Sequence, residues 1–205
     1  MKKLMMVAVL TTTFATQAQE NTNNFFNHVT LEAGYGFNQA LMPDNVDRTD
    51  VSGLKTMQLG ANYQIDELWG VRGTYSNTQF QDKNNDDLGI NYNRITAEAT
   101  FGVLKAIYGP EDKEVSRFDI VAHSGFGLNF GKSKANDSKD TMGNWQIGLK
   151  PEYKISNNVG IFVDGTYIMN FKQNIGYNGL SIAGEKETTG SYVTALIGLS
   201  IKLNK

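Results

Sequence analysis

Histidine and serine side chains offer the first candidate chemistry in this sequence. The chain has two histidines, His28 and His123, and no cysteine. His123 is followed directly by Ser124, and a histidine base that activates a serine hydroxyl is a common way to build a nucleophile. On an extended strand, however, adjacent residues point to opposite faces, so the imidazole does not reach the hydroxyl proton. We therefore expect no catalytic residues and no enzymatic activity.

A second candidate is the acidic segment 82–87. Asp82, Asn84 and Asp86 stand at the first, third and fifth positions of a calcium-binding loop. Such a loop needs glycine at its sixth position and a bidentate glutamate at its twelfth. This chain has Asp87 and Asn93 there. The segment is therefore expected to be a solvated acidic loop, with no metal site and no cofactor.

The overall composition excludes several classes of protein. The 205 residues include 19 Lys plus Arg and 21 Asp plus Glu, a net charge of -2 with both signs spread along the chain. A nucleic-acid-binding protein would need a basic stripe, so no nucleic-acid partner is expected. The lack of cysteine excludes a disulfide framework and a zinc ribbon.

The N-terminal residues have the pattern of an export signal. Lys2 and Lys3 are followed by a short apolar run over 4–10 and by the small residue Ala18. This order is typical of a secretory signal peptide, which we place at 1–18. Residues 19–27 are rich in asparagine and are interpreted as a flexible leader, and the folded domain is expected over 28–205.

Alternation of apolar and polar residues dominates the rest of the chain. Such a period of two predicts strands whose two faces differ. It occurs in eight segments: 28–38, 55–65, 69–77, 92–104, 117–130, 144–155, 159–170 and 191–203. Short turns alternate with the long polar segments 39–54, 78–91, 131–143 and 171–190. The segment 105–116 is an exception, because it is long where a short turn is expected. This layout predicts an all-β, eight-stranded, antiparallel up-and-down transmembrane barrel.

The two faces indicate which side of the barrel meets lipid. The apolar faces of all eight segments carry no formal charge, whereas the polar faces hold most of the glycines in the strands. A soluble ligand-binding barrel would instead put its apolar face inward. A lysine or arginine on a lipid-facing position costs roughly 2–4 kcal/mol at mid-membrane, which explains an uncharged outer face. Aromatic residues near the segment ends predict two interfacial girdles. They are Tyr63, Trp69, Phe118 and Tyr153 on the turn side and Tyr35, Phe37, Tyr75, Phe130 and Trp145 on the loop side.

The inward face carries charges of both signs. The narrow interior of an eight-stranded barrel can be nearly filled by side chains, where charges are tolerated only when paired. We therefore predict a salt-bridge network that closes the lumen, centred on Glu32, Arg72, Arg94 and Glu98 and including His123. Its further members are Asp119, Lys150, Glu152 and Asp164, with Lys154 and Lys202 at the rim. An open, narrow pore for ions or small solutes remains the alternative.

The strand from Val29 to Phe37 (VTLEAGYGF) and the segment from Gly148 to Ile155 (GLKPEYKI) carry a family resemblance. With the signal peptide and the alternating loops, they resemble the small OmpA-type and OmpX-like outer-membrane barrels over about 28–203. The peptidoglycan-binding domain of full-length OmpA proteins is not expected here. The resemblance implies a monomer in the outer membrane of a Gram-negative bacterium, in contact with lipid and lipopolysaccharide.

The resemblance also implies a structural or surface-interaction role, in which the four long loops offer sites for an extracellular ligand. A lipid-modifying barrel enzyme, suggested only by His123 and Ser124, is the less favoured alternative.

Overall fold

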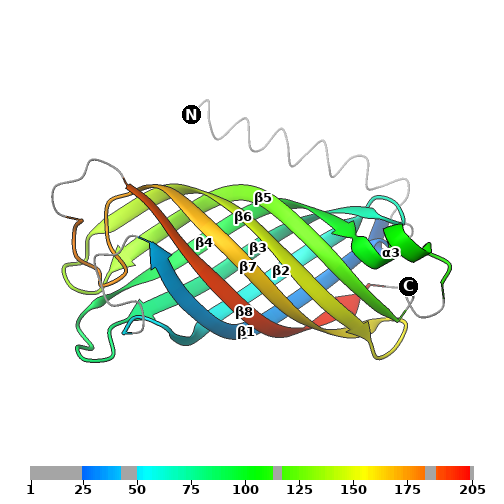
Figure 1. Cartoon of the computed structure of the whole chain (residues 1–205), viewed down its shortest axis with the longest axis horizontal. Coiled ribbons are helices and arrows are strands. Elements are labelled where there is room, and N and C mark those ends of the chain that lie inside the picture. The colour runs from blue at the N-terminus through cyan, green and yellow to red at the C-terminus, as the bar shows by residue number, and fades with distance from the viewer. Residues whose placement is uncertain (1–24, 43–49, 113–116, 183–187, 204–205) are drawn as a thin grey trace.

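The computed structural model describes residues 25–42, 50–112, 117–182 and 188–203. Eight antiparallel strands close into a barrel in which each strand pairs with its neighbours in the chain and β1 pairs with β8 (Figure 1). The strands are β1 (Val29–Met42), β2 (Gly53–Gln64), β3 (Trp69–Gln81), β4 (Gly89–Gly102), β5 (Phe118–Ser133), β6 (Lys139–Lys154), β7 (Val159–Gln173) and β8 (Thr188–Lys202). The predicted fold class is confirmed. The signal peptide over 1–18 and most of the leader over 19–27 lie outside the described residues.

One end of the barrel carries a short helix, α3 (Val103–Tyr108), and the described chain terminus at Leu203 (Figure 1). We call it the α3 end and the opposite end the loop end. The helix takes up the last two residues of the strand expected over 92–104, which ends at Gly102 instead, and the first four residues of the segment 105–116, which the sequence pattern did not assign to any element. The other connections at the α3 end are tight turns. In the first of them, the Asp66 carboxylate accepts hydrogen bonds from the backbone N–H of Trp69 and of Leu68, which lowers the pKa of Asp66.

Side-chain orientation follows the alternation predicted from the sequence. Large apolar side chains on the outer face are exposed along every strand, for example Leu59, Val71, Leu149 and Leu199. The side chains that point inward are mostly buried and polar. A soluble ligand-binding barrel has the reverse arrangement. An apolar outer surface of this kind is stable in contact with lipid. No helix among the described residues is long and apolar enough to cross a membrane.

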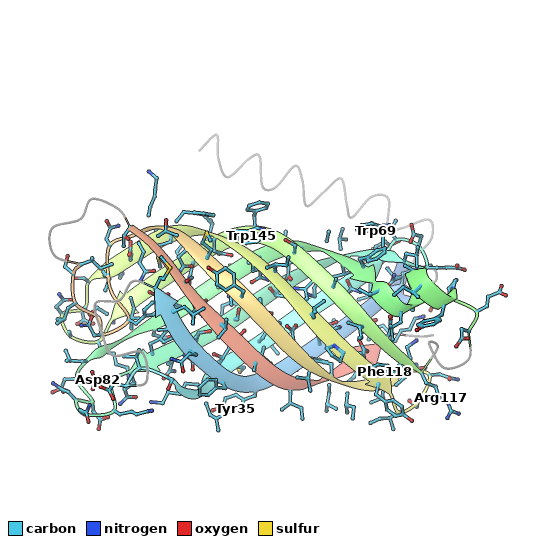
Figure 2. The ribbon with its side chains drawn as sticks, in the orientation of Figure 1. Tyr35, Trp69, Asp82, Arg117, Phe118 and Trp145 are labelled. Atoms are coloured by element: carbon cyan, nitrogen blue, oxygen red, sulfur yellow. The ribbon has the colours of Figure 1, made fainter. Side chains whose placement is uncertain are left out.

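The aromatic side chains of the outer face lie at two levels along the barrel. Trp69 and Phe118 lie toward the α3 end, whereas Tyr35 and Trp145 lie nearer the middle of the barrel (Figure 2). Of the residues predicted to form the girdles, Tyr63 and Trp145 are half-buried and the other seven are exposed: Tyr35, Phe37, Trp69, Tyr75, Phe118, Phe130 and Tyr153. The second level was expected at the strand ends, but the strands continue beyond it.

The extension of the strands at the loop end reverses their polarity. Beyond Tyr75, the outward residues of β3 and β4 are amides, and Asn77 donates hydrogen bonds to Asn91 and Asn93 across the two strands. Toward the ends of the two strands the inward residues Phe80, Ile90 and Tyr92 are apolar or aromatic and fully buried. This stretch of the barrel therefore has a polar outside and an apolar inside, as in a water-soluble protein. The strands predicted from the sequence end too early at the loop end, because the outward positions there are no longer apolar.

An apolar cluster closes the lumen at the loop end. We call it the apolar plug, and it consists of Ala40, Val51, Phe80, Ile90, Tyr92, Met142, Ile168, Ile175, Tyr177 and Tyr192. The rings of Phe80, Tyr177 and Tyr192 pack against one another at steep angles, with centroids 4.6–6.2 Å apart. Aromatic packing of this kind favours a solid core over an open channel.

Residues 174–182 fold back into the mouth of the barrel and complete the plug. The Asp140 carboxylate accepts hydrogen bonds from the backbone N–H of Asn174 (2.7 Å) and Ile175 (3.1 Å). The Tyr177 hydroxyl donates to the carbonyl of Ser191 at 2.8 Å. The segment 171–190 was expected to be a polar external loop. Its first residues instead continue β7, and its described centre is packed inside because Ile175 and Tyr177 bury their side chains there.

Candidate functional site

Charged side chains meet across the lumen at the level of Arg72. We call them the charged cluster: Glu32, Arg72, Glu98, His123, Lys150 and Asp164. They come from six strands and all point inward. Arg72 and Glu98 are direct cross-strand neighbours on β3 and β4. Glycines stand opposite several of the long side chains: Gly60 opposite Glu32, Gly125 opposite Glu98 and Gly148 opposite His123. The alternation of long and small residues lets the charges converge in a narrow barrel.

Arg72 is the centre of the charged cluster. Its guanidinium donates to Glu98 at 2.7 Å, to Asp164 at 3.2 Å and to Glu32 at 3.3 Å. Its side chain and those of the three carboxylates are almost fully shielded from solvent. A buried guanidinium is stable only when its charge and its N–H groups are matched in this way. Arg72 therefore ties three strands to its own through the middle of the barrel.

His123 lies between two of the same carboxylates. Its Nδ1 is 2.7 Å from Glu98 Oε2 and its Nε2 is 3.2 Å from Asp164 Oδ1. A neutral imidazole has only one N–H, so only the protonated ring donates to both acceptors. With His123 protonated, the cluster holds three cations and three carboxylates: Arg72, His123 and Lys150 against Glu32, Glu98 and Asp164. The charges balance within the cluster.

Lys150 extends the cluster toward the α3 end. Its ammonium forms ion pairs with Glu32 and, at 3.1 Å, with Glu152, and it lies 5.2 Å from the centre of the Phe162 ring. Beyond it, the Asp119 carboxylate accepts from the backbone N–H of Leu104 and pairs with Lys105 of α3 at 3.4 Å. Asp119 thereby fastens the short helix to the rim.

A cavity of about 320 Å³ lies between the charged cluster and α3. Its lining includes Glu32, Lys150 and Glu152 of the strands together with Lys105 and Glu111 beside the rim. The lumen is therefore accessible from the α3 end as far as the charged cluster.

The structure brings together most, but not all, of the residues predicted from the sequence to share one network. Ion pairs link seven of them: Glu32, Arg72, Glu98, His123, Lys150, Glu152 and Asp164. Asp119 pairs separately with Lys105. Arg94, which was expected at the centre, lies one level nearer the loop end and bonds to Tyr192 instead. Register explains the difference, because Arg94 pairs with Ser76 across β3 and β4 and not with a carboxylate.

Several hydroxyl groups that sequence analysis did not single out also join the charged cluster. Thr74 donates to Glu98 at 3.1 Å and Thr166 donates to Asp164 at 2.6 Å. Both threonines are inward residues on a strand that also supplies a charged residue two positions away. This position, on the inward face and two residues from a charge, is the feature by which the two threonines could have been found from the sequence.

The arrangement contains no nucleophile with a base among the described residues. His123 is enclosed by carboxylates, whereas the Ser124 hydroxyl donates to the carbonyl of Gln146 and accepts from Trp145 Nε1 at 3.1 Å. The His123 and Ser124 side chains are on opposite faces, as the strand geometry requires. Within the described residues no group of three or more His, Asp or Glu side chains is placed to hold a metal ion. The chemistry that this site supports is electrostatic cross-linking of the barrel.

Solved structures show which proteins share this fold. The crystal structure of Neisserial surface protein A (NspA) is similar with a TM-score of 0.59 and 12% sequence identity, over 85% of this chain and 97% of that chain. This chain has the eight-stranded fold of the outer-membrane β-barrels. Other outer-membrane barrels with similar structures include Ail of Yersinia pestis (TM-score 0.46, 14% identity, 84% of this chain and 96% of that chain). A major outer membrane protein of Thermus thermophilus is also similar (TM-score 0.46, 11% identity, 84% and 97%).

The resemblance of this chain to these proteins is one of fold. No protein-family model matches this sequence, and no curated protein sequence matches it. At 12% identity to NspA, the likeness says nothing about which partner the barrel meets.

A substitution at Gly148 would show how tightly the charged cluster is packed. A Cβ atom at this position would lie 2.4 Å from His123 Nε2 and 2.6 Å from the carbonyl oxygen of Gly165. We expect Gly148→Ala to displace the imidazole and lower the free energy of unfolding by about 1–3 kcal/mol, as other overpacked cores do. The measurement is urea unfolding of the barrel in lipid vesicles. Gly143→Ala on the same strand is the matched control, because its nearest neighbour is Phe171 at 3.7 Å. Equal stability of the two variants would contradict the packing argument.

Proposed function

We propose that this barrel lies in a bacterial outer membrane, that it is not an enzyme, and that it has a structural or surface-interaction role carried by its loop end. Outer-membrane barrels have short turns on the periplasmic side and longer loops outside the cell. The tight turns of this chain gather at the α3 end, so the α3 end faces the periplasm and the apolar plug faces the exterior. The cleavable signal peptide over 1–18 provides the export that this location requires.

The observation that carries the proposal is that the lumen is closed at two levels. The charged cluster crosses the bore, and the apolar plug fills the external mouth. An eight-stranded barrel has little interior space beyond its own side chains. A path for solutes would have to break the ion pairs of Arg72 and also displace the aromatic rings around Tyr177. The accessible surface outside the cell is then the loops, held on a solid support.

The external loops offer charges of both signs. Residues 82–87 carry three aspartates, and Lys132, Lys134 and Lys139 lie around the neighbouring connection. Lys132 pairs with Asp137 at 2.9 Å in the open, and Lys134 donates to Gln81 at 3.1 Å. Lysine side chains at this height can contact lipopolysaccharide phosphates. We propose a monomer that contacts lipid and lipopolysaccharide, with further ligands approaching the loops within 39–54, 78–91, 131–143 and 171–190.

The closed lumen makes a direct prediction about conductance. We expect the refolded mature barrel to show no steady single-channel conductance in a planar bilayer, although it inserts. Insertion is checked independently by the different migration of unheated and boiled samples on a gel. A reproducible, steady conductance would contradict the closed lumen and make the narrow-pore alternative the leading function.

The orientation of the barrel can be tested with single cysteines, because the chain has none of its own. A cysteine at Asp86 should react with a membrane-impermeant maleimide in intact cells. A cysteine at Ser156, in a turn at the α3 end, should react only after the cells are broken. The reverse pattern would refute a surface role for the loop end.

The lipid-modifying alternative has its own test. Unchanged lipid A mass spectra on overexpression would exclude this alternative.

A further inference from the structure

A layer of polar side chains lies inside the barrel between the charged cluster and the apolar plug. We call it the polar belt: Ser76, Arg94, Asn129, Asn144 and Asn170, from the five consecutive strands β3 to β7. Ser76 pairs with Arg94, Arg94 with Asn129 and Asn144 with Asn170 across neighbouring strands. Asn129 also donates to Asn170 at 3.1 Å. Direct cross-strand neighbours have Cβ atoms about 5 Å apart, so these polar groups converge.

Arg94 is the charged member of the polar belt, and its charge is not balanced by any ion pair among the described residues. The residue is only 1% exposed. One guanidinium nitrogen donates to the Tyr192 hydroxyl at 3.0 Å, and the guanidinium lies 5.8 Å from the centre of the same ring. Within the described part of the chain, Nε and Nη2 have no hydrogen-bond partner. Arg72, at the next level down, differs sharply because three carboxylates surround it.

Three buried carboxylates of the neighbouring levels, Glu98, Asp164 and Asp140, are engaged elsewhere. Glu98, on the same strand, accepts from Arg72 and His123. Asp164 accepts from the same two groups. Asp140, on the side of the apolar plug, accepts from the backbone of residues 174 and 175. None of these carboxylates can neutralise Arg94 without breaking the contacts that hold the charged cluster or the plug.

Other donors of the polar belt are unsatisfied in the same place. Asn144 Nδ2, Asn170 Nδ2 and Ser76 Oγ are buried and have no partner among the described residues. Such groups are rare in folded proteins and normally mark an ordered water or a bound ion. The side-chain oxygens of Asn129 and Asn144 are also unpaired, and they can accept hydrogen bonds from water molecules that lie beside an ion. The excess of positive charge, however, selects an anion.

We infer that Arg94 and the polar belt bind a small monovalent anion of the halide class inside the lumen. A single unbalanced cation calls for a single negative charge. The ligand must be small, because the apolar plug lies on one side of the belt and the charged cluster on the other. A halide accepts hydrogen bonds and donates none, which matches the unpaired N–H groups of Arg94, Asn144 and Asn170, whereas the unpaired oxygens of Asn129 and Asn144 are left to water molecules beside the ion. This inference goes beyond the proposed surface role and does not depend on it.

The direct test is to refold the full mature barrel in sodium bromide and to locate bromide by anomalous diffraction. We expect an anomalous peak in contact with the Arg94 guanidinium, and its loss when the protein is refolded in sodium gluconate instead. Electron density for water alone at this position in the bromide-refolded protein would overturn the inference. Because this test uses the wild-type chain, it does not depend on any variant folding.

The second test measures whether the anion is bound at ordinary concentrations. We expect the midpoint of thermal unfolding to rise by about 3–5 °C for each tenfold increase in bromide above the dissociation constant. Asn170→Ala, which removes one donor, should weaken this dependence, and Arg94→Met should abolish it. Lys132→Met, which removes an exposed cation instead, should leave it unchanged. A midpoint that does not respond to bromide in the wild-type barrel, or that responds equally in Arg94→Met and Lys132→Met, would show no binding at the polar belt.

Discussion

Replacing Arg72 with methionine is expected to destabilise this barrel by about 3–5 kcal/mol. Methionine keeps much of the length of the side chain but removes the guanidinium that Glu32, Glu98 and Asp164 face. The three carboxylates would then be buried with only His123 and Lys150 to balance them. Breaking a buried ion pair from one side costs far more than the net value of the pair, because the remaining charge stays desolvated. Urea unfolding in lipid vesicles, followed by gel migration of unheated samples, measures the loss.

Lys132→Met is the matched control for Arg72→Met. It removes the same charge from an ion pair with Asp137 that is largely exposed to solvent. Exposed pairs contribute about 0–1 kcal/mol, so little change is expected. Adding Glu98→Gln to Arg72→Met should recover part of the stability, since one unpaired carboxylate is then neutral. If Arg72→Met and Lys132→Met were equally stable, the charged cluster would not be the cross-link described here.

A lysine in place of Ile197 is expected to lower the stability of the barrel by roughly 2–4 kcal/mol. Ile197 lies near the middle of β8, points outward and is 69% exposed. Its cross-strand neighbours Tyr35 and Val163 are exposed as well. In a bilayer, a lysine at this position must place its ammonium in the hydrocarbon or reach for the interface. The measurement is urea unfolding in vesicles of phospholipid.

The depth dependence of this effect provides its control. Ile65 is 58% exposed and follows β2 directly, at the turn of the α3 end. Ile65→Lys is therefore near the interface and should cost about 0–1 kcal/mol. Equal costs for the two lysines would mean that the apolar outer surface is not embedded in lipid, which would contradict the membrane assignment of the whole barrel.

The alternation of residue types was sufficient to predict the barrel. Strands have a period of two, so each outward position, such as Leu31, Ala33 and Tyr35, could be assigned from the sequence without any knowledge of the neighbouring strand. The same parity identified Arg72, Glu98 and His123 as inward residues. These predictions depend only on the local geometry of one strand.

The ends of the strands and the interior of the loop end were not predictable in the same way. Beyond Tyr75 the alternation continues, but the polar residues Asn77 and Gln79 point outward and Phe80 points inward. The rule that lipid-facing positions are apolar therefore predicts that the strand ends there. Continued alternation with reversed polarity was the signal for a stretch of barrel with a polar outer face.

The sequence by itself determined the number of strands, their order, the uncharged outer face and the set of inward charges, because these follow from residue type and parity along one chain. Only the tertiary structure decided which inward charges meet. Register between strands and the tilt of a closed barrel bring Arg72 to Asp164, 92 positions away, and leave Arg94 beside Tyr192. The tertiary structure also decided that Ile175 and Tyr177 fold into the mouth of the barrel. These contacts join residues that are far apart in the chain, so the pattern of residues along a single strand does not predict them.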